Sequence, residues 1–375
     1  MPSDPGSALP QSASHDVTIR QFIRLSAGGK RLRLRLSNAF GAAPLVLDTI
    51  RIGLADGGAA GAIRAGTSHA VRFGGSDAVT VPAGAEYASD PIELPVHGLE
   101  TLAISFHLGE AQPRQTVHYV SRATSYLAAG NFSDATTLPG ATPIEHWYQL
   151  AAVDVDAGVG ARAIAVLGDS ITDGHGSTLD GNNRWTDVLA DRLQADPRTR
   201  NIGVLNFGIS GNRLLKDGGA PSGMARLNRE ALSQPGIATL IVFEGVNDLG
   251  ILSREGPVTP EARDAVVTGL TQAYAQIIAY AHSRNIRVVG ATLLPFGGTK
   301  VYRSDADADA DRQRVNAWIR APGHFDAVID FDAVVRDPSN PSGLLAKYDT
   351  GDRLHPSAAG YGAMGRSIVL GDLLR

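Results

Sequence analysis

The sequence predicts an α/β protein in two parts: an all-β, jelly-roll-like sandwich, then a three-layer α/β/α domain with a parallel sheet. Residues 17–155 contain short alternating runs of polar and apolar residues, separated by Gly, Pro, Asp and Asn. Beyond residue 160, near-continuous apolar runs alternate with amphipathic helical patterns. A chain of 375 residues is long enough for two such domains.

The first part is predicted from runs such as RLRLRLSN (31–38) and TLAISFHL (101–108). Alternation of this kind is typical of antiparallel strands with one buried face. No stretch between residues 17 and 150 predicts a helix of three turns. We therefore assign residues 1–158 to an accessory β-sandwich domain, in which residues 1–16 form a flexible lead-in.

The second part, residues 159–375, alternates predicted strands with predicted helices. Near-continuous apolar strands of this type belong to parallel sheets that are covered on both faces. We expect about five strands, and a last helix that begins near Ser357. The predicted strands are residues 163–167, 202–207, 237–243, 286–294 and 325–331.

Composition excludes several classes of function. The net charge of −4 leaves no broad basic field to attract nucleic acid or anionic lipid. No apolar run reaches the roughly 18 residues of a membrane span. The absence of cysteine excludes disulfides and thiolate metal sites. The N-terminus has no signal-peptide core, although a chain whose signal was removed would look the same, so a secreted or periplasmic location stays open. The sequence does not decide the oligomeric state.

Four polar segments stand out against this pattern. GDS, with Ser170, GISGNR, with Gly211, and EGVND, with Asn247, each directly follow a predicted parallel strand. The carboxyl ends of such strands meet at one edge of the sheet, so these loops should lie together. Near the other end of the chain, GDRLHPS places Asp352 three residues before His355.

These residue types match the requirements of acyl transfer. A serine hydroxyl becomes a nucleophile when an imidazole accepts its proton and a carboxylate orients that imidazole. The oxyanion that develops needs donors, which a glycine N–H, approached without a Cβ, and an asparagine amide supply. Singly, Ser170 could be a helix cap, Gly211 a turn residue and Asn247 an Asx-turn residue. Their joint occurrence favours catalysis.

The segments GDSITDG, NFGISGN, EGVND and DRLH resemble, in this order, the four blocks of the SGNH/GDSL hydrolases. The resemblance covers residues 161–375. It implies Ser170 as nucleophile, His355 as base and Asp352 as the acid that orients the base. It also implies an oxyanion hole made of the Ser170 and Gly211 N–H groups and the Asn247 side chain, with no cofactor. The N-terminal half resembles the accessory β-sandwich of some two-domain members.

Other residues near these blocks carry alternative interpretations. His175, in the loop after Ser170, is a rival base, and Asp169 and Asp248 are expected to hold their loops through backbone N–H groups. Arg213 and Trp185 are candidates for lining the substrate pocket. Trp185 is equally the first core residue of its helix, the more common place for an aromatic at that position.

The acidic stretch SDADADADR (304–312) invites comparison with a calcium loop. Counted from Asp305, an EF-hand would need glycine where Ala310 stands and glutamate where Asn316 stands. The aspartates are better placed to stabilise the positive end of the helix RQRVNAWIR that follows. No metal is therefore predicted.

The resulting prediction is a serine esterase that hydrolyses short-chain acyl esters of a small molecule or a carbohydrate. Among these, acetyl esters are the expected substrates. A lipase or lysophospholipase-type acylhydrolase is an alternative, although no amphipathic lid is visible. A catalytically silent carbohydrate-binding protein is an alternative of another class. A nucleophile elbow of the G-x-S-x-G type is absent around Ser170, which disfavours an ordinary α/β-hydrolase.

Overall fold

The computed structural model describes residues 1–57, 61–252, 254, 258–302 and 304–374. Contacts group the chain into two compact units. The first consists of Met1–Gly160 with Pro197–Asn201, and the second of Ala161–Asp196 with Ile202–Arg375. No helix in the described part of the chain is both long enough and apolar enough to cross a membrane.

The first unit is built from antiparallel strands, as the sequence predicts. Its largest sheet has the order β11-β10-β1-β8-β4-β5, a second has β13-β2-β7, and β3-β6 and β12-β9 form pairs. The strands are β1 (His15–Arg24), β2 (Leu32–Ser37), β3 (Leu45–Leu47), β4 (Ile50–Leu54), β5 (His69–Ala70), β6 (Val79–Val81), β7 (Glu86–Ala88), β8 (Thr101–Glu110), β9 (Val117–His118), β10 (Ser125–Ala129), β11 (Thr142–Ile144), β12 (Trp147–Tyr148) and β13 (Leu150–Val155).

One hydrophobic core joins the two larger sheets. Leu32, Leu34 and Leu36 of β2 are buried in the same cluster as Ile19 of β1 and Phe106 of β8. This arrangement follows from the period of two in a strand, which sends alternate side chains to the same face. The strands therefore form two layers over a shared core. Within the described part of this unit, the one helical turn is η1 (Gln11–Ala13).

The N-terminal residues differ from the flexible lead-in that the sequence suggests. The Met1 ammonium donates a hydrogen bond to the Val117 carbonyl at 3.0 Å. The Tyr148 hydroxyl donates to the Ser7 carbonyl, also at 3.0 Å. The first strand already begins at His15. Residues 1–16 are thus anchored by hydrogen bonds to distant strands, which composition alone does not reveal.

The second unit contains the predicted parallel sheet of five strands, in the order β15-β14-β16-β17-β18. Every pairing in this sheet is parallel, with β14 between β15 and β16. The strands are β14 (Arg162–Gly168), β15 (Ile202–Gly208), β16 (Ile237–Phe243), β17 (Arg287–Ala291) and β18 (Ala327–Ile329), and a separate hairpin is formed by β19 (Arg336–Asp337) and β20 (Asn340–Leu344).

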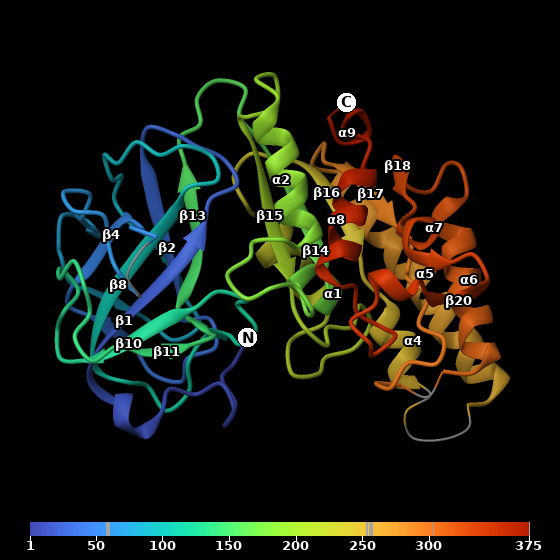
Figure 1. Ribbon diagram of the computed structural model, residues 1–375, viewed down its shortest axis with the longest axis horizontal. Coiled ribbons are helices and arrows are strands. Elements are labelled where there is room, and N and C mark those ends of the chain that lie inside the picture. The colour runs from blue at the N-terminus through green and yellow to red at the C-terminus, as the bar shows by residue number, and fades with distance from the viewer. Residues whose placement is uncertain (58–60, 253, 255–257, 303, 375) are drawn as a thin grey trace. The chain divides into compact units, whose positions relative to one another are not determined.

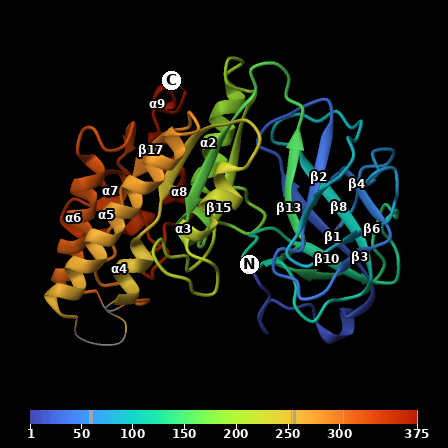
Figure 2. The same cartoon turned by 180° about the vertical axis from the view of Figure 1, so that it is seen from behind.

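Helices cover both faces of this sheet. Figure 1 shows α2 and α8 over one face, and Figure 2, from behind, shows α3 and α5 over the other. The helices are α1 (Ser170–Asp173), α2 (Trp185–Ala195), α3 (Gly223–Arg226), the π-helix η2 (Leu227–Leu232), α4 (Val246–Leu252), α5 (Pro260–His282), α6 (Ala306–Arg320), α7 (Phe331–Val335), η3 (Ala346–Tyr348), α8 (Ala358–Ser367) and α9 (Leu370–Leu373). The three-layer α/β/α prediction is confirmed.

The acidic stretch belongs to helix α6 instead of preceding it. The helix begins at Ala306, and the Asp305 carboxylate caps it by accepting the Ala308 N–H. Asp307 and Asp309 lie in the first turn, where carboxylates stabilise the positive helix end. Asn316, at the position where a calcium loop would need glutamate, instead holds the backbone of Leu293 through both its amide oxygen and its amide nitrogen.

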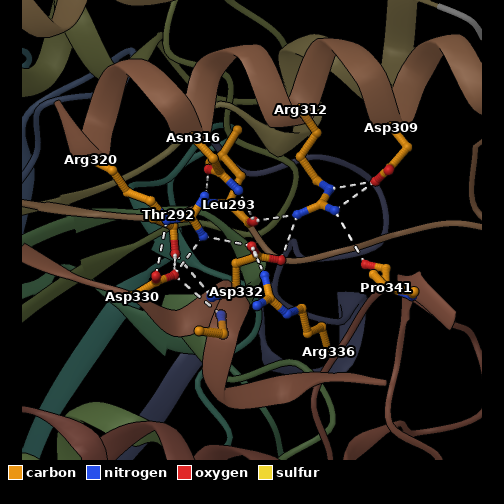
Figure 3. A network of polar contacts seen from close by, with 11 residues as sticks. Thr292, Leu293, Asp309, Arg312, Asn316, Arg320, Asp330, Asp332, Arg336 and Pro341 are labelled. Carbon is orange, nitrogen blue, oxygen red and sulfur yellow. Dashed lines mark hydrogen bonds and ion pairs between the residues drawn. The ribbon is translucent and has the colours of Figure 1, made fainter. Parts of the chain in front are cut away.

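A buried ionic network joins α6, α7 and the chain after β17 (Figure 3). Arg312 and Asp332 have no solvent exposure, and their side chains lie 2.7 Å apart. Asp332 also accepts from Arg320 and Arg336, whose guanidinium groups reach toward solvent. Arg312 further donates to the Leu293 carbonyl. One buried carboxylate of α7 thus binds three cations, two from α6 and one from the β19 strand.

Replacing Asp332 by alanine should destabilise this unit by about 3–5 kcal/mol, because the buried Arg312 would lose its fully buried counter-charge and keep only the partly exposed Asp309. Arg336→Gln is the matched control at the exposed end of the same network and should cost less than about 1 kcal/mol. Urea unfolding followed by tryptophan fluorescence measures both, since Trp185 and Trp318 lie in this unit. Equal losses for the two variants would contradict a dominant role of the buried pair.

Candidate active site

Ser170 stands directly after the carboxyl end of the strand between β15 and β16. Strand β14 ends at Gly168, and Ser170 is the first residue of α1. The Asp169 carboxylate caps this helix by accepting the Ile171 N–H at 2.9 Å. The side chain of Ser170 therefore leaves the chain at a fixed strand-to-helix turn, and the residue is 6% exposed.

Ser170, His355 and Asp352 form one continuous line of hydrogen bonds. The Ser170 Oγ lies 2.9 Å from the His355 Nε2. On the other side of the ring, Nδ1 lies 2.6 Å from the Asp352 Oδ2. A carboxylate can only accept, so Nδ1 carries the hydrogen and Nε2 offers its lone pair to the serine hydroxyl. In this arrangement His355 can take the proton from Ser170.

The turn between Asp352 and His355 holds the carboxylate in its charged form. The backbone N–H groups of Leu354 and His355 each donate to the Asp352 Oδ1 at 2.9 Å. Burial opposes ionisation of Asp352, but the hydrogen bonds from the His355 ring and these N–H groups outweigh it and hold its pKa below the usual range. Asp352 is therefore an anion at neutral pH and can stabilise a protonated His355.

Two further carboxyl groups lie buried beneath the loops. Burial raises the pKa of Asp169 to about 7, against the opposing effects of the Ile171 N–H and the charge of His355. Asp248 accepts the N–H groups of Leu214 and Leu215 at 2.8 and 3.0 Å, and burial raises its pKa as well. These bonds confirm that both aspartates hold loop backbone. Asp248 links the third polar segment to the chain after the second.

Gly211 has a φ of +74°, a left-handed conformation that a residue with a Cβ rarely adopts. A Cβ added there would meet no protein atom within 4 Å. The protein thus needs glycine at this position for its backbone conformation, whereas the sequence argument gave close approach as the reason. The conformation fixes the direction of the backbone that carries the second polar segment.

The Asn247 side chain is 1% exposed, and both ends of its amide have partners. Its Nδ2 donates to the Asn212 carbonyl at 2.7 Å, which joins the third segment to the second. Its Oδ1 accepts from the Tyr302 hydroxyl. A primary amide nitrogen carries two hydrogens, so one donor remains for another acceptor.

A buried arginine that the sequence argument missed ties the strand ends together. Arg226 has no exposed surface, and its guanidinium donates to the carbonyls of Gly168 and Phe207 at 2.9 and 2.7 Å. It also donates to the Asn212 side chain at 2.9 Å and lies 3.4 Å from Glu244. Arg226 stands where α3 meets a π-helix, an irregularity that is frequent at functional sites. No pattern in the sequence distinguishes it from a surface arginine.

The rival histidine lies against the site, and its ring is tilted by 41° against that of His355. The two ring centroids are 4.1 Å apart, whereas the recorded partner of the Ser170 hydroxyl is His355. Among the described residues, His175, Asp352 and His355 make up a group whose possible ligand atoms lie within 4.8 Å of one another. Asp352 and His355 already bind each other, and His355 also binds Ser170. A metal ion there would have to displace those hydrogen bonds.

The two residues proposed to line a pocket have other surroundings. Trp185 is fully buried and packs edge-on against Phe243 and Phe331, which fits the core alternative. Arg213 donates to the Asp217 carbonyl within its own loop. No contact described for either residue reaches Ser170 or His355. Trp185 therefore has no surface that a substrate could touch.

Comparison with known proteins places residues 166–363 in the sequence model of the GDSL-like Lipase/Acylhydrolase family. A solved GDSL-like lipase from Bacteroides thetaiotaomicron is 20% identical, covering 56% of this chain and 88% of its own, with a TM-score of 0.41. An acetyl xylan esterase, AlAXEase, is 19% identical, covering 55% and 96%, with a TM-score of 0.40. TesA is 22% identical, covering 57% and 98%, with a TM-score of 0.41. No curated protein sequence matches this chain.

The raised pKa of Asp169 predicts a pH-dependent cost in stability. A folded-state pKa above the unfolded value gives a contribution that is complete below about pH 4 and is lost as the pH rises through about 7. Asp169→Asn keeps the oxygen that caps α1 but cannot ionise. The variant should therefore gain free energy of unfolding relative to the wild type as the pH increases over this interval.

Urea unfolding of both proteins across this pH range measures the difference. Asp264→Asn is the control, because Asp264 is an exposed carboxylate in a surface ion pair with Arg314. The wild type and Asp169→Asn are compared by their free energies of unfolding. If the difference between them stays constant with pH, the buried carboxyl does not titrate in this range.

Proposed function

Because this chain belongs to the GDSL-like lipase/acylhydrolase family, we propose that it is a serine esterase that hydrolyses short-chain acyl esters, preferably acetyl esters. The observation that carries the proposal is the unbroken line of hydrogen bonds from Asp352 through His355 to the Ser170 hydroxyl. We propose residues 159–375 as the catalytic domain and residues 1–158 as its accessory β-sandwich.

In the proposed reaction, the Ser170 Oγ attacks the ester carbonyl while His355 Nε2 accepts its proton. Asp352 keeps Nδ1 protonated and stabilises the imidazolium. The backbone N–H groups of Ser170 and Gly211 and the remaining N–H of Asn247 donate to the oxyanion. His355 then returns the proton to the leaving alcohol, and an acyl-serine forms. Water attacks this ester by the same route and releases the acid and free Ser170.

The preference for short acyl groups rests on burial. Ser170 and His355 are each only 6% exposed, so little of the nucleophile and of the base is open to a substrate. A small acyl group meets that constraint more easily than a long chain, which favours an esterase over a lipase or lysophospholipase. A silent binding protein has no need of a serine hydroxyl bonded to an oriented imidazole. Whether the alcohol is a sugar or another small molecule is decided by assay.

A panel of p-nitrophenyl esters of increasing chain length, run beside acetylated sugars, tests the function. We expect the highest kcat/KM for acetate and a decline as the acyl chain lengthens. An organophosphate should label Ser170 in the wild type and fail to label Ser170→Ala, which should have almost no turnover. Absence of both hydrolysis and labelling in the folded wild type would refute the proposal.

The acid and base assignments predict a graded series of losses. Asp352→Asn should lower kcat by about 10³–10⁴, because the amide can favour the wrong tautomer of His355. His355→Ala should lose nearly all activity, whereas His175→Ala, the control at the adjacent ring, should retain most of it. Steady-state kinetics on a short-chain ester gives these values, with folding checked by circular dichroism. If His355→Ala kept most of the activity and His175→Ala lost it, the assignment of His355 as the base would be wrong.

A further inference from the structure

We infer that Tyr302 is a positioning residue that holds the Asn247 amide in the orientation required for the oxyanion hole. The inference rests on the proposed function, since it assigns a support to a donor proposed there. Tyr302 lies between β17 and α6, outside all four polar segments. Its hydroxyl meets the Oδ1 of Asn247.

The partners of the Asn247 amide fix its orientation without ambiguity. The Asn212 carbonyl can only accept, so the amide atom that faces it at 2.7 Å must be the nitrogen. The amide oxygen then faces Tyr302, and the phenol must donate. These two bonds at opposite ends of a planar group determine where the second N–H points. That N–H is the proposed oxyanion donor.

The chemistry of Tyr302 suits a permanent donor. Burial raises the pKa of its hydroxyl to about 12, further supported by the negative charge of Asp169. The phenol therefore keeps its proton throughout the pH range in which esters are assayed. A hydrogen bond to the amide oxygen also polarises the amide and strengthens donation from its nitrogen. Without this bond, the nearly buried oxygen of Asn247 would lack a partner.

Helix α4 is shaped to receive the ring. A Cβ at Gly250 would lie only 2.3 Å from Cδ2 of Tyr302, so the aromatic ring rests against the helix backbone. Gly250 follows Asn247 by three residues, which places both on the same side of the helix. Glycine at this position therefore permits the close approach that brings the hydroxyl to the amide.

The segment that carries Tyr302 is itself attached to the turn of the catalytic acid. The Thr299 hydroxyl and the Lys300 N–H both donate to the Asp352 carbonyl, each at 3.1 Å. The Val301 N–H donates to the Thr299 Oγ1 at 3.1 Å. Residues 299–302 thus connect the turn of Asp352 and His355 to the Asn247 amide. The segment fixes the distance between the two halves of the site.

Tyr302→Phe removes the donor and keeps the ring. We expect kcat to fall about three- to tenfold with KM unchanged, the effect of one lost hydrogen bond that matters in the transition state. Gly250→Ala, which displaces the ring but leaves both side chains intact, should produce a similar loss. Tyr280→Phe is the matched control, because Tyr280 is half exposed on α5 and should retain wild-type kinetics.

A double-mutant cycle with Asn247→Ala separates positioning from general structural damage. Asn247→Ala alone should lower kcat by about 10²–10³. In that background Tyr302→Phe should have no further effect, since the group it orients is gone. Steady-state kinetics on p-nitrophenyl acetate, with urea unfolding of each variant, provides the readout.

The possible results distinguish this inference from the proposed function. Normal kcat for Tyr302→Phe beside a large loss for Asn247→Ala would overturn the role of Tyr302 alone. An equal Tyr302→Phe loss in both backgrounds, or a change in KM only, would also overturn it. Normal kcat for Asn247→Ala would overturn the oxyanion assignment and, with it, the role of Tyr302. An inactive wild type would reject the esterase itself.

Discussion

The geometry of the site depends on the buried guanidinium of Arg226. Its donors reach carbonyls at the ends of β14 and β15 and the side chain of Asn212. The polar segments of Ser170 and Gly211 begin at those carbonyls, so one planar group sets their spacing. A fork of fixed donors can bridge several acceptors in a way that a lysine ammonium cannot. The Gly168 carbonyl also accepts the Ile209 N–H at 3.0 Å, so Arg226 adds a second donor to a carbonyl that the second polar segment already binds.

Arg226 has two glutamate neighbours, and their pKa values are shifted in opposite directions. Burial raises the pKa of Glu244 well above its usual value, and the nearby Asp169 adds to this effect against the attraction of Arg226. Glu230 is only partly buried, and the attraction of Arg226 and Arg229 outweighs the effect of burial and lowers its pKa. Arg226 lies 2.9 Å from Glu230, the neighbour whose pKa is lowered, and 3.4 Å from Glu244, the neighbour whose pKa is raised. Glu230 is therefore the better counter-charge of the two.

The sequence predicted those parts of the site that depend on local chemistry. A polar loop after an apolar strand, or a carboxylate three residues before a histidine, is visible in the printed residues, and so is the strand–helix alternation that aligns the loops. Arg226 and Tyr302 were not predictable, because their roles arise from contacts over large separations in sequence. The sequence pattern placed the start of α6 too far along the chain. Aspartates at the start of a helix resemble a polar loop when the cap at Asp305 is not known. The anchoring of residues 1–16 was missed because hydrogen bonds between distant strands leave no local pattern.

The turn from Asp352 to His355 contains the proposed acid and the proposed base within a single loop. Arg353 adopts a φ of +61°, a conformation unusual for a residue with a side chain, and the turn closes through N–H groups on the same carboxylate that binds the ring. The Asp352 carboxylate and the His355 ring are therefore held together by hydrogen bonds within one turn. A displacement of this loop as a whole would separate the Ser170 hydroxyl from the His355 ring and leave the hydrogen bond between His355 and Asp352 intact. In such a state Ser170 would lose the group proposed to take its proton, while His355 and Asp352 kept their mutual geometry.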